Sequence, residues 1–174
     1  GIPWRVAFAL QNEGWYLRQD IIWSKPNPMP ESVTDRCTKS HEYIFLLTKS
    51  AKYYFDNEAI QEEATGYDGR KDIQFKGRLK YKYSGYDHFK NPYIRNKRSV
   101  WTVPTKPYKE SHFATFPEAL IDPCIKAGCP ENGTVLDAFS GAGTTGLVAL
   151  KNNRNYIGIE LNPDYIEIAK KRLG

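Results

Sequence analysis

Hydrophobic residues recur along the chain with two periods, which predict an alternation of helices and strands. In residues 3–14, Val6 and Leu10 stand four positions apart with further apolar residues between them, as on one face of a helix. Residues 17–23 and 41–47 are short apolar runs with Ile and aromatic side chains, as in buried strands. We therefore expect a helix followed by two strands in the N-terminal part of the chain.

Proline and polar residues separate these elements from the remainder. The three prolines within residues 26–30 remove backbone donors and restrict φ, so this run is expected to be an extended loop. A turn at residues 48–50 is expected to lead into a short third strand at residues 53–55. Residues 117–127 have a helical pattern that Pro123 is expected to interrupt.

The pattern is clearest at the C-terminal end, where strands and helices alternate around a glycine loop. This order of strand, loop, helix, strand and helix is typical of a parallel nucleotide-binding unit. The last helix has Asn162 at its N-cap and Pro163 at its first position, both favoured there. The expected elements are a strand at 134–139, a loop at 140–143, a helix at 144–152, a strand at 156–161 and a helix ending at Leu173.

The composition agrees with one globular domain. The chain has 174 residues, 40% hydrophobic and 26% charged, and a single domain commonly holds about 100–200 residues. No run approaches the roughly 18 apolar residues of a membrane span, and the N-terminus has no signal-peptide pattern. The chain begins without Met and with a helix-like pattern, so we expect a fragment that lacks the N-terminal part of its protein.

Metal chemistry is not expected from the cysteines and histidines. Cys37, Cys124 and Cys129 are odd in number and lack C-x-x-C spacing, which favours reduced thiols over disulfides or a zinc site. The three histidines are far apart in the sequence.

Positive charge is concentrated in one segment. Residues 66–98 hold ten Lys or Arg against three Asp, a net charge of +7 within a chain of net charge +5. Seven Tyr and Phe residues are interleaved with these cations. Cations pair with phosphates and aromatic rings stack on bases, which favours nucleic-acid binding. The alternative is a solvated loop whose tyrosines pack against the protein.

The glycine loop offers a choice of ligands. Residues 141–146 read GAGTTG, which matches G-x-G-x-x-G, and they follow an expected strand and open an expected helix. Glu160 stands at the end of the next expected strand, where a carboxylate can bind ribose hydroxyls. An NAD(P)-linked oxidoreductase and a tight turn without a ligand are therefore both open.

Two features favour a cationic ligand over a dinucleotide. Asp137 comes just before the glycines, where its carboxylate repels a pyrophosphate but attracts an ammonium or sulfonium group. Only 28 residues follow Gly146, so the rest of the sheet must come from upstream, unlike in a dehydrogenase. Asp137, the glycine loop and Glu160 suit S-adenosyl-L-methionine, with its adenine against Leu161.

Five segments resemble the DNA amino-methyltransferases that act on N6 of adenine or N4 of cytosine. They read WSKPNPMP (23–30), HEYIFLLTK (41–49), HFATFP (112–117), DAFSGAGTTG (137–146) and GIELNP (158–163). Their order is the permuted β order of that family, with the catalytic half, then a variable insert, then the cofactor half. The resemblance implies an α/β fold with a doubly wound, Rossmann-like sheet of about seven strands and an inserted target-recognition segment.

The resemblance also implies boundaries and roles. Residues 1–56 fall in the catalytic half, 57–105 in the target-recognition insert and 106–174 in the cofactor-binding half. The residues expected to bind the cofactor are His112, Phe113, Ala114, Thr115, Phe116, Pro117, Asp137, Phe139, Ser140, Gly141, Gly143, Thr144, Thr145, Glu160, Leu161 and Asn162. Those expected to bind DNA are Lys76, Arg78, Lys80, Lys82, Tyr83, Lys90, Arg95, Lys97 and Arg98.

Plainer structural roles are open for several of these residues. Asp137 also suits a turn or helix cap, Glu160 a solvated strand end, and His112 with Phe113 packing beneath the glycine loop. Lys25 and Arg36 flank the proline-rich run, where they suit either the DNA backbone or ordinary surface positions.

The family's catalytic tetrapeptide, (Asp/Asn/Ser)-Pro-Pro-(Tyr/Phe), is absent from the chain. In this family order it precedes Gly1, so no catalytic residue is expected here, and the fragment alone is expected to be inactive. The implied reaction is methyl transfer from S-adenosyl-L-methionine to an exocyclic amine of a base flipped out of a specific double-stranded DNA sequence. A restriction-modification or phage system in the cytoplasm of a bacterial, archaeal or phage-infected cell is implied. A homodimer, a cognate restriction endonuclease and a non-catalytic DNA-binding remnant are left open; no membrane partner or metal is expected.

Overall fold

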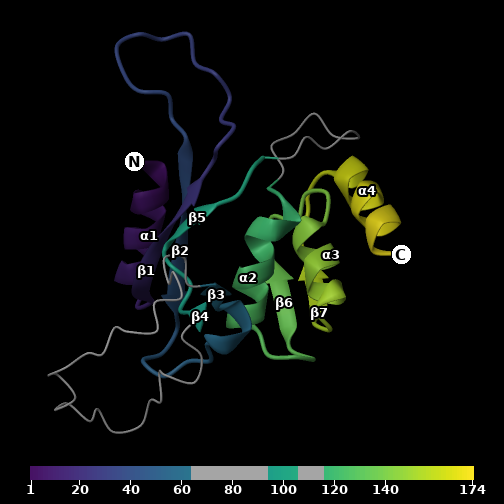
Figure 1. Ribbon diagram of the computed structural model, residues 1–174. Helices are drawn as coiled ribbons and strands as arrows, with labels where there is room; N and C mark the ends of the chain where they lie inside the picture. The colour runs from purple at the N-terminus through teal and green to yellow at the C-terminus, as the bar shows by residue number, and fades with distance from the viewer. Residues whose placement is uncertain (64–93, 106–115) are drawn as a thin grey trace, which may run out of the picture.

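The computed structural model describes residues 1–63, 94–105 and 116–174. Residues 1–63 hold both helices and strands, residues 94–105 hold two short strands, and residues 116–174 have the order helix, strand, helix, strand and helix (Figure 1). The elements are α1 (Ile2–Asn12), β1 (Tyr16–Ser24), β2 (His41–Thr48), the 3-10 helix η1 (Glu58–Ile60), β3 (Glu62–Glu63), β4 (Ile94–Arg95), β5 (Val100–Thr102), α2 (Glu118–Gly128), β6 (Thr134–Asp137), α3 (Thr144–Lys151), β7 (Asn155–Gly158) and α4 (Pro163–Leu173).

A three-stranded sheet with the order β2-β1-β5 has helices on both faces. Its strand β1 is antiparallel to β2 and parallel to β5, which aligns Trp23 with Trp101. The two tryptophans pack with Leu120 of α2 on one face. On the other face, the Trp4 ring of α1 lies 5.5 Å from the Tyr43 ring and 4.9 Å from the Phe45 ring. Side chains alternate along a strand, so β2 serves both layers.

A second sheet pairs β6 with β7 in parallel, and the crossover helix α3 packs beside it (Figure 1). Ile125 of α2 packs with Val148 and Ala149 of α3 in a core cluster that Val135 and Tyr156 of the sheet join. Helix α2 therefore contributes to the cores of both sheets, through Leu120 near its start and Ile125 near its end. The expected strand–loop–helix–strand unit is confirmed.

A short antiparallel ribbon of β3 and β4 lies between these units in the sequence, with Glu62 opposite Arg95. Strand β5 falls within the range expected for the insert, yet it is hydrogen-bonded to β1 in the first sheet. The ribbon therefore pairs the residues just before position 64 with those just after position 93. Strand β5 then joins the first sheet.

Some local expectations were wrong. Within the described residues, the strands are hydrogen-bonded in groups of three, two and two. Tyr53, Tyr54 and Phe55 are in an irregular segment, which the Asp56 N–H fixes to the Ala127 carbonyl of α2 at 2.9 Å. Helix α2 continues through Pro123, because the ring removes one helical hydrogen bond while Leu120 and Ile125 are buried on either side of it.

The described residues hold no group of three His, Cys, Asp or Glu side chains arranged to bind a metal ion. All three cysteines are free thiols, and burial raises the pKa of Cys124 to about 11. Within the same residues, no helix has both the length and the apolar character needed to cross a membrane.

Candidate functional site

The carboxyl ends of β6 and β7 form the edge where the predicted cofactor residues meet. The last ladder pair joins Asp137 to Gly158, and the Ile159 N–H extends the pairing by donating to the Asp137 carbonyl at 2.9 Å. The Ser140 N–H then donates to the Ile159 carbonyl at 2.9 Å. Asp137, the glycine loop and Glu160 are therefore brought together at one edge, where open parallel sheets bind ligands.

Asp137 is held by the turn that follows it. Its Oδ1 accepts a hydrogen bond from the Phe139 N–H at 3.0 Å, and the residue is half-buried. This bond fixes the carboxylate at the tip of β6. The expected strand at 134–139 ends earlier, at Asp137, because the chain turns there.

Glu160 joins the glycine loop to the start of α4. Its Oε2 accepts from the Gly141 N–H at 2.8 Å, and its Oε1 accepts from the Leu161 and Asn162 N–H groups, each at 2.9 Å. These N–H groups, with that of Asn162 first, hold the pKa of Glu160 below its usual range. The side chain is therefore an anion at neutral pH. The expected strand at 156–161 ends at Gly158, before this residue.

Two glycines of the loop adopt backbone conformations that other residues rarely reach. Gly141 has φ of 50° and Gly143 has φ of 77°, both in the left-handed region. Gly143 is the N-cap of α3, and its N–H donates to the Ser140 carbonyl at 2.9 Å. A Cβ atom at Gly143 would also lie 3.1 Å from the Ala169 Cβ of α4. The loop can therefore lie close to both α4 and a ligand.

The third glycine of the motif packs α3 against the sheet. A Cβ atom at Gly146 would lie 2.5 Å from the Tyr156 ring. The Tyr156 hydroxyl is in turn 2.7 Å from the Ser140 Oγ. Gly146 thereby lets a β7 side chain reach beneath the loop and hold it, which the motif alone did not reveal.

We expect Gly146→Ala to lower the free energy of unfolding by about 1–3 kcal/mol, the usual cost of overpacking a filled interior. The added methyl must displace the Tyr156 ring, so the contact with Ser140 should weaken as well. Urea denaturation followed by circular dichroism measures the change. Gly128→Ala is the matched control, because a Cβ atom there meets nothing within 4 Å. An equal loss in both variants would contradict this packing role.

The chain also holds the loop from α4, through contacts that the sequence analysis missed. Arg172 Nη1 donates to the Ala142 carbonyl at 2.7 Å and to the Thr144 Oγ1 at 3.2 Å. Thr144 and Thr145 are buried, so their side chains belong to the interior beneath the loop. Asn162 is the expected N-cap, and its Oδ1 accepts from the Asp164 N–H at 3.0 Å.

Two large apolar side chains are exposed at this edge. Phe139 is 91% exposed and Leu161 is 95% exposed, one on each side of the glycine loop in sequence. A cavity of about 580 Å³ lies between the end of β7 and α4, and its lining includes Ser140 and Glu160, their neighbours in the sequence. Exposed apolar side chains around a few convergent polar groups are typical of a small-molecule site.

The remaining predicted cofactor residues lie upstream. His112, Phe113, Ala114 and Thr115 lie outside the described residues. Phe116 packs against the tryptophan cluster of the first sheet, and Pro117 is the buried N-cap of α2. These last two therefore have a packing role, and their contact with a cofactor stays a prediction.

The predicted DNA-binding cations are also divided. Lys76, Arg78, Lys80, Lys82, Tyr83 and Lys90 lie outside the described residues. Arg95 and Arg98 both pair with Glu62, at 3.0 Å and 2.7 Å. Lys97 Nζ lies 5.1 Å from the centre of the Trp101 ring.

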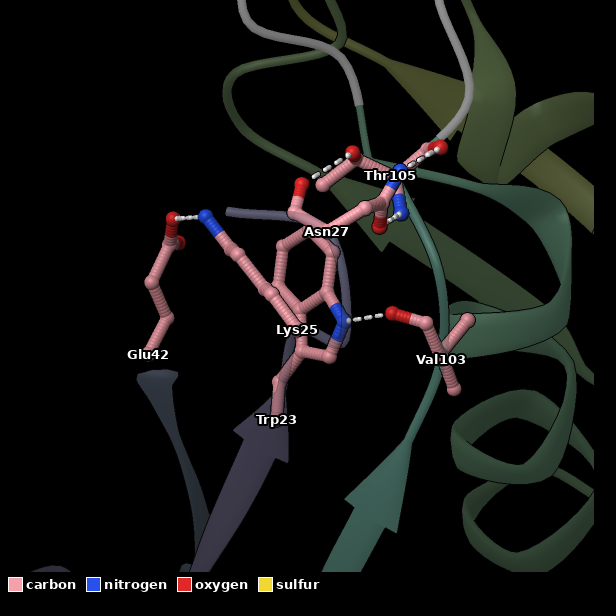
Figure 2. A network of polar contacts seen from close by, with 6 residues as sticks. All are labelled: Trp23, Lys25, Asn27, Glu42, Val103 and Thr105. Atoms are coloured by element: carbon pink, nitrogen blue, oxygen red, sulfur yellow. Dashed lines mark hydrogen bonds and ion pairs between the residues drawn. The ribbon is translucent and has the colours of Figure 1, made fainter. Parts of the chain in front are cut away.

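The proline-rich run is fixed to the chain beyond β5 by a set of polar contacts (Figure 2). Asn27 Nδ2 donates to the Thr105 carbonyl at 3.2 Å, and the Thr105 N–H donates to Asn27 Oδ1 at 2.9 Å. The Trp23 Nε1 donates to the Val103 carbonyl at 2.7 Å. The two loops after the parallel strands β1 and β5 are therefore joined at the carboxyl edge of the first sheet.

Two cations beside this run are engaged with acidic neighbours. Lys25 forms an ion pair with Glu42, and its Nζ lies 4.4 Å from the centre of the Trp23 ring. Arg36 pairs with Glu31 at 3.2 Å and with Asp35 at 3.4 Å. Both side chains therefore have acidic partners within the protein, and contact of either with the DNA backbone stays a prediction.

Comparison of the sequence with known families gives a match to the DNA methylase family over residues 2–171. The type II methyltransferase M.Cfr9I of Citrobacter freundii is 53% identical over 173 residues, covering 99% of this chain and 49% of that protein. M.SmaI of Serratia marcescens, also a type II methyltransferase, is 50% identical, covering 99% and 51%. The chain spans about half the length of these relatives.

Solved structures agree on the fold. The M1.HpyAVI–SAM complex superposes with a TM-score of 0.66 at 26% identity, covering 98% of this chain and 68% of that chain. The cytosine-N4-specific PvuII DNA methyltransferase superposes with a TM-score of 0.72 at 18% identity, covering 99% and 56%. The expected Rossmann-like α/β class is thereby confirmed.

Proposed function

The chain belongs to the N6/N4 DNA methylase family, and from that membership we propose that it is part of a site-specific DNA methyltransferase. The enzyme transfers a methyl group from S-adenosyl-L-methionine to N6 of adenine or N4 of cytosine in double-stranded DNA. The observation that carries this proposal is the shared edge at which Asp137, the glycine loop and Glu160 meet. The relatives at 53% and 50% identity are type II methyltransferases, which supports a restriction-modification system.

The residues at the edge fit the chemical groups of this cofactor. Asp137 is an acid fixed at the strand tip by the Phe139 N–H, so it can attract the positive end of the methionine part. Glu160 is held as an anion and can accept hydrogen bonds from the ribose hydroxyls. The exposed Leu161 side chain offers an apolar surface for adenine. When bound, the cofactor supplies the electrophilic methyl group.

The residues of this chain supply some of the roles that methyl transfer needs. The exocyclic amine is a poor nucleophile because its lone pair is delocalised into the ring, so alignment of the amine with the methyl group supplies much of the rate. The residues here hold the cofactor and, through residues 66–98, the DNA. The tetrapeptide that binds the amine in this family is not among these 174 residues.

The wider setting follows from the same relatives. We infer that the enzyme acts in the bacterial cytoplasm on DNA that a cognate restriction endonuclease would otherwise cut. We also propose that the enzyme forms a homodimer.

Methylation of plasmid DNA by the intact gene product, with mapping of the modified base, tests the proposal. We expect label from methyl-labelled S-adenosyl-L-methionine on adenine N6 or cytosine N4 at one recurring sequence. Calorimetry on dialysed protein separates the alternatives: binding of NADH instead of S-adenosyl-L-methionine would favour an oxidoreductase. DNA binding with neither cofactor binding nor methylation would favour a non-catalytic remnant.

A further inference from the structure

An acidic side chain just before the basic segment is paired with two arginines at the end of that segment. Glu62 of β3 accepts a hydrogen bond at the same oxygen, Oε1, from Arg95 Nε at 3.0 Å and from Arg98 Nε at 2.7 Å. Partial burial raises the pKa of Glu62, but the two arginines, Arg98 first, hold it below its usual range. We call β3, β4 and residues 96–98 the neck, because they join residues 64–93 to the sheet.

The neck is attached to the core on both sides. The Trp101 Nε1 donates to the Arg98 carbonyl at 2.6 Å, and the Trp101 side chain packs in the core cluster with Trp23. On the other side, Asn57 Nδ2 donates to Asn96 Oδ1 at 2.8 Å. Arg98 therefore has its backbone fixed to the buried tryptophan and its side chain fixed to Glu62.

The geometry of the ion pair leaves a role for Arg98 in binding an anion. Its bond to Glu62 uses Nε, so this bond does not engage the terminal Nη1 and Nη2 groups. The Arg98 side chain is 63% exposed. A guanidinium held at one edge presents its other donors in a fixed plane, which suits the two oxygens of a phosphate.

We propose that Glu62 is a positioning residue for DNA binding, which orients Arg98, together with Arg95, toward the phosphate backbone. This inference rests on the proposed function, because it takes DNA as the ligand of the neck. The alternative predicts the opposite change in DNA affinity. If Glu62 only neutralises the two arginines, its removal should strengthen DNA binding.

The neighbouring residue provides a matched control. Glu63 follows Glu62 in β3, is exposed, and loses the same single charge on substitution by Gln. Side chains of adjacent strand residues point to opposite faces. If only net charge mattered, Glu62→Gln and Glu63→Gln should each raise the affinity for DNA slightly. A loss of DNA affinity in Glu62→Gln alone therefore isolates the positioning role.

The experiment measures duplex DNA affinity of the intact gene product by fluorescence anisotropy at several salt concentrations. We expect Glu63→Gln to leave affinity unchanged or raise it slightly, and Glu62→Gln to weaken it by about 3- to 10-fold, the order of one ordinary hydrogen bond. Methylation should show a raised KM for DNA with kcat at saturating DNA retained. S-adenosyl-L-methionine affinity, unchanged in both variants, verifies the fold.

Two further variants make the test robust. Glu62→Asp keeps the charge and is expected to fall between the unsubstituted protein and Glu62→Gln, and it replaces Glu62→Gln if that protein does not fold. In a double-mutant cycle, Glu62→Gln should cost little more once Arg98→Gln is present, because the two act as a unit.

Tighter DNA binding by both Glu62→Gln and Glu63→Gln would overturn the inference and leave the proposed function intact. Additive losses in the cycle would also overturn it. Absence of DNA binding by the unsubstituted protein would instead overturn the proposed function, and this inference with it.

Discussion

Asp137→Asn is expected to lower the affinity for S-adenosyl-L-methionine by about 10- to 100-fold, which corresponds to about 1.4–2.8 kcal/mol. The substitution keeps the shape of the side chain and an oxygen that can accept from the Phe139 N–H, so the turn should survive. What it removes is the negative charge at the tip of β6. Isothermal titration calorimetry on the purified protein measures the loss directly.

Two controls separate a charge effect from damage to the fold. Glu131→Gln removes one negative charge near the opposite end of β6, where the exposed side chain lies just before Thr134, and it should leave cofactor affinity unchanged. DNA affinity should be nearly unchanged in both variants. Comparison with S-adenosylhomocysteine, which lacks the sulfonium charge, tells whether Asp137 acts on the sulfonium or on the ammonium. Unchanged cofactor affinity in Asp137→Asn would count against this site.

Charge reversal at Lys80 and Lys82 is the second large effect. These residues lie outside the described part of the chain, so the expectation comes from the net charge of +7 over residues 66–98. Lys80→Glu with Lys82→Glu should weaken DNA binding by about 10- to 100-fold near 0.1 M salt. If both lysines contact phosphates, the slope of log affinity against log salt should flatten by about 1.8.

Lys49 and Lys52 provide a control pair with the same total charge. Lys49 and Lys52 follow β2 at the end of the sheet opposite the carboxyl end of β1, since the two strands are antiparallel. Reversal of these two charges changes the net charge equally. If the salt slopes of the two double variants are the same, residues 66–98 form a solvated loop and not a DNA-binding segment.

Much of the local structure was predictable because it depends on neighbours in the sequence. The apolar period of α1 and the cap at Asn162 depend on contacts within a few residues. The strands β1 and β2 are recognisable from their local composition, although their ladder joins distant residues. The short strand expected at residues 53–55 failed for the opposite reason. Its aromatic composition suits a strand, but no ladder partner pairs with it among the described residues.

The site was predictable in outline and not in detail. The glycine spacing and the two acids indicated a ligand edge, because parallel strands bring their carboxyl ends together wherever they pair. The spacing could not show that Gly146 makes room for Tyr156, or that Arg172 donates to the loop. The Asn27–Thr105 contact joins residues 78 positions apart, and no period in the sequence encodes such a distance.

By itself, the sequence determined the class of fold, the meeting of Asp137 and Glu160 at one sheet edge, and the placement of positive charge over residues 66–98. Only the tertiary structure decided which charges are already paired, as Arg95 and Arg98 are with Glu62. The physical reason is that periodicity and charge are sums over neighbouring residues, whereas an ion pair or a close packing contact depends on where distant segments meet. Glu62 and Arg98 are 36 positions apart, and the β3–β4 ribbon is what brings them together.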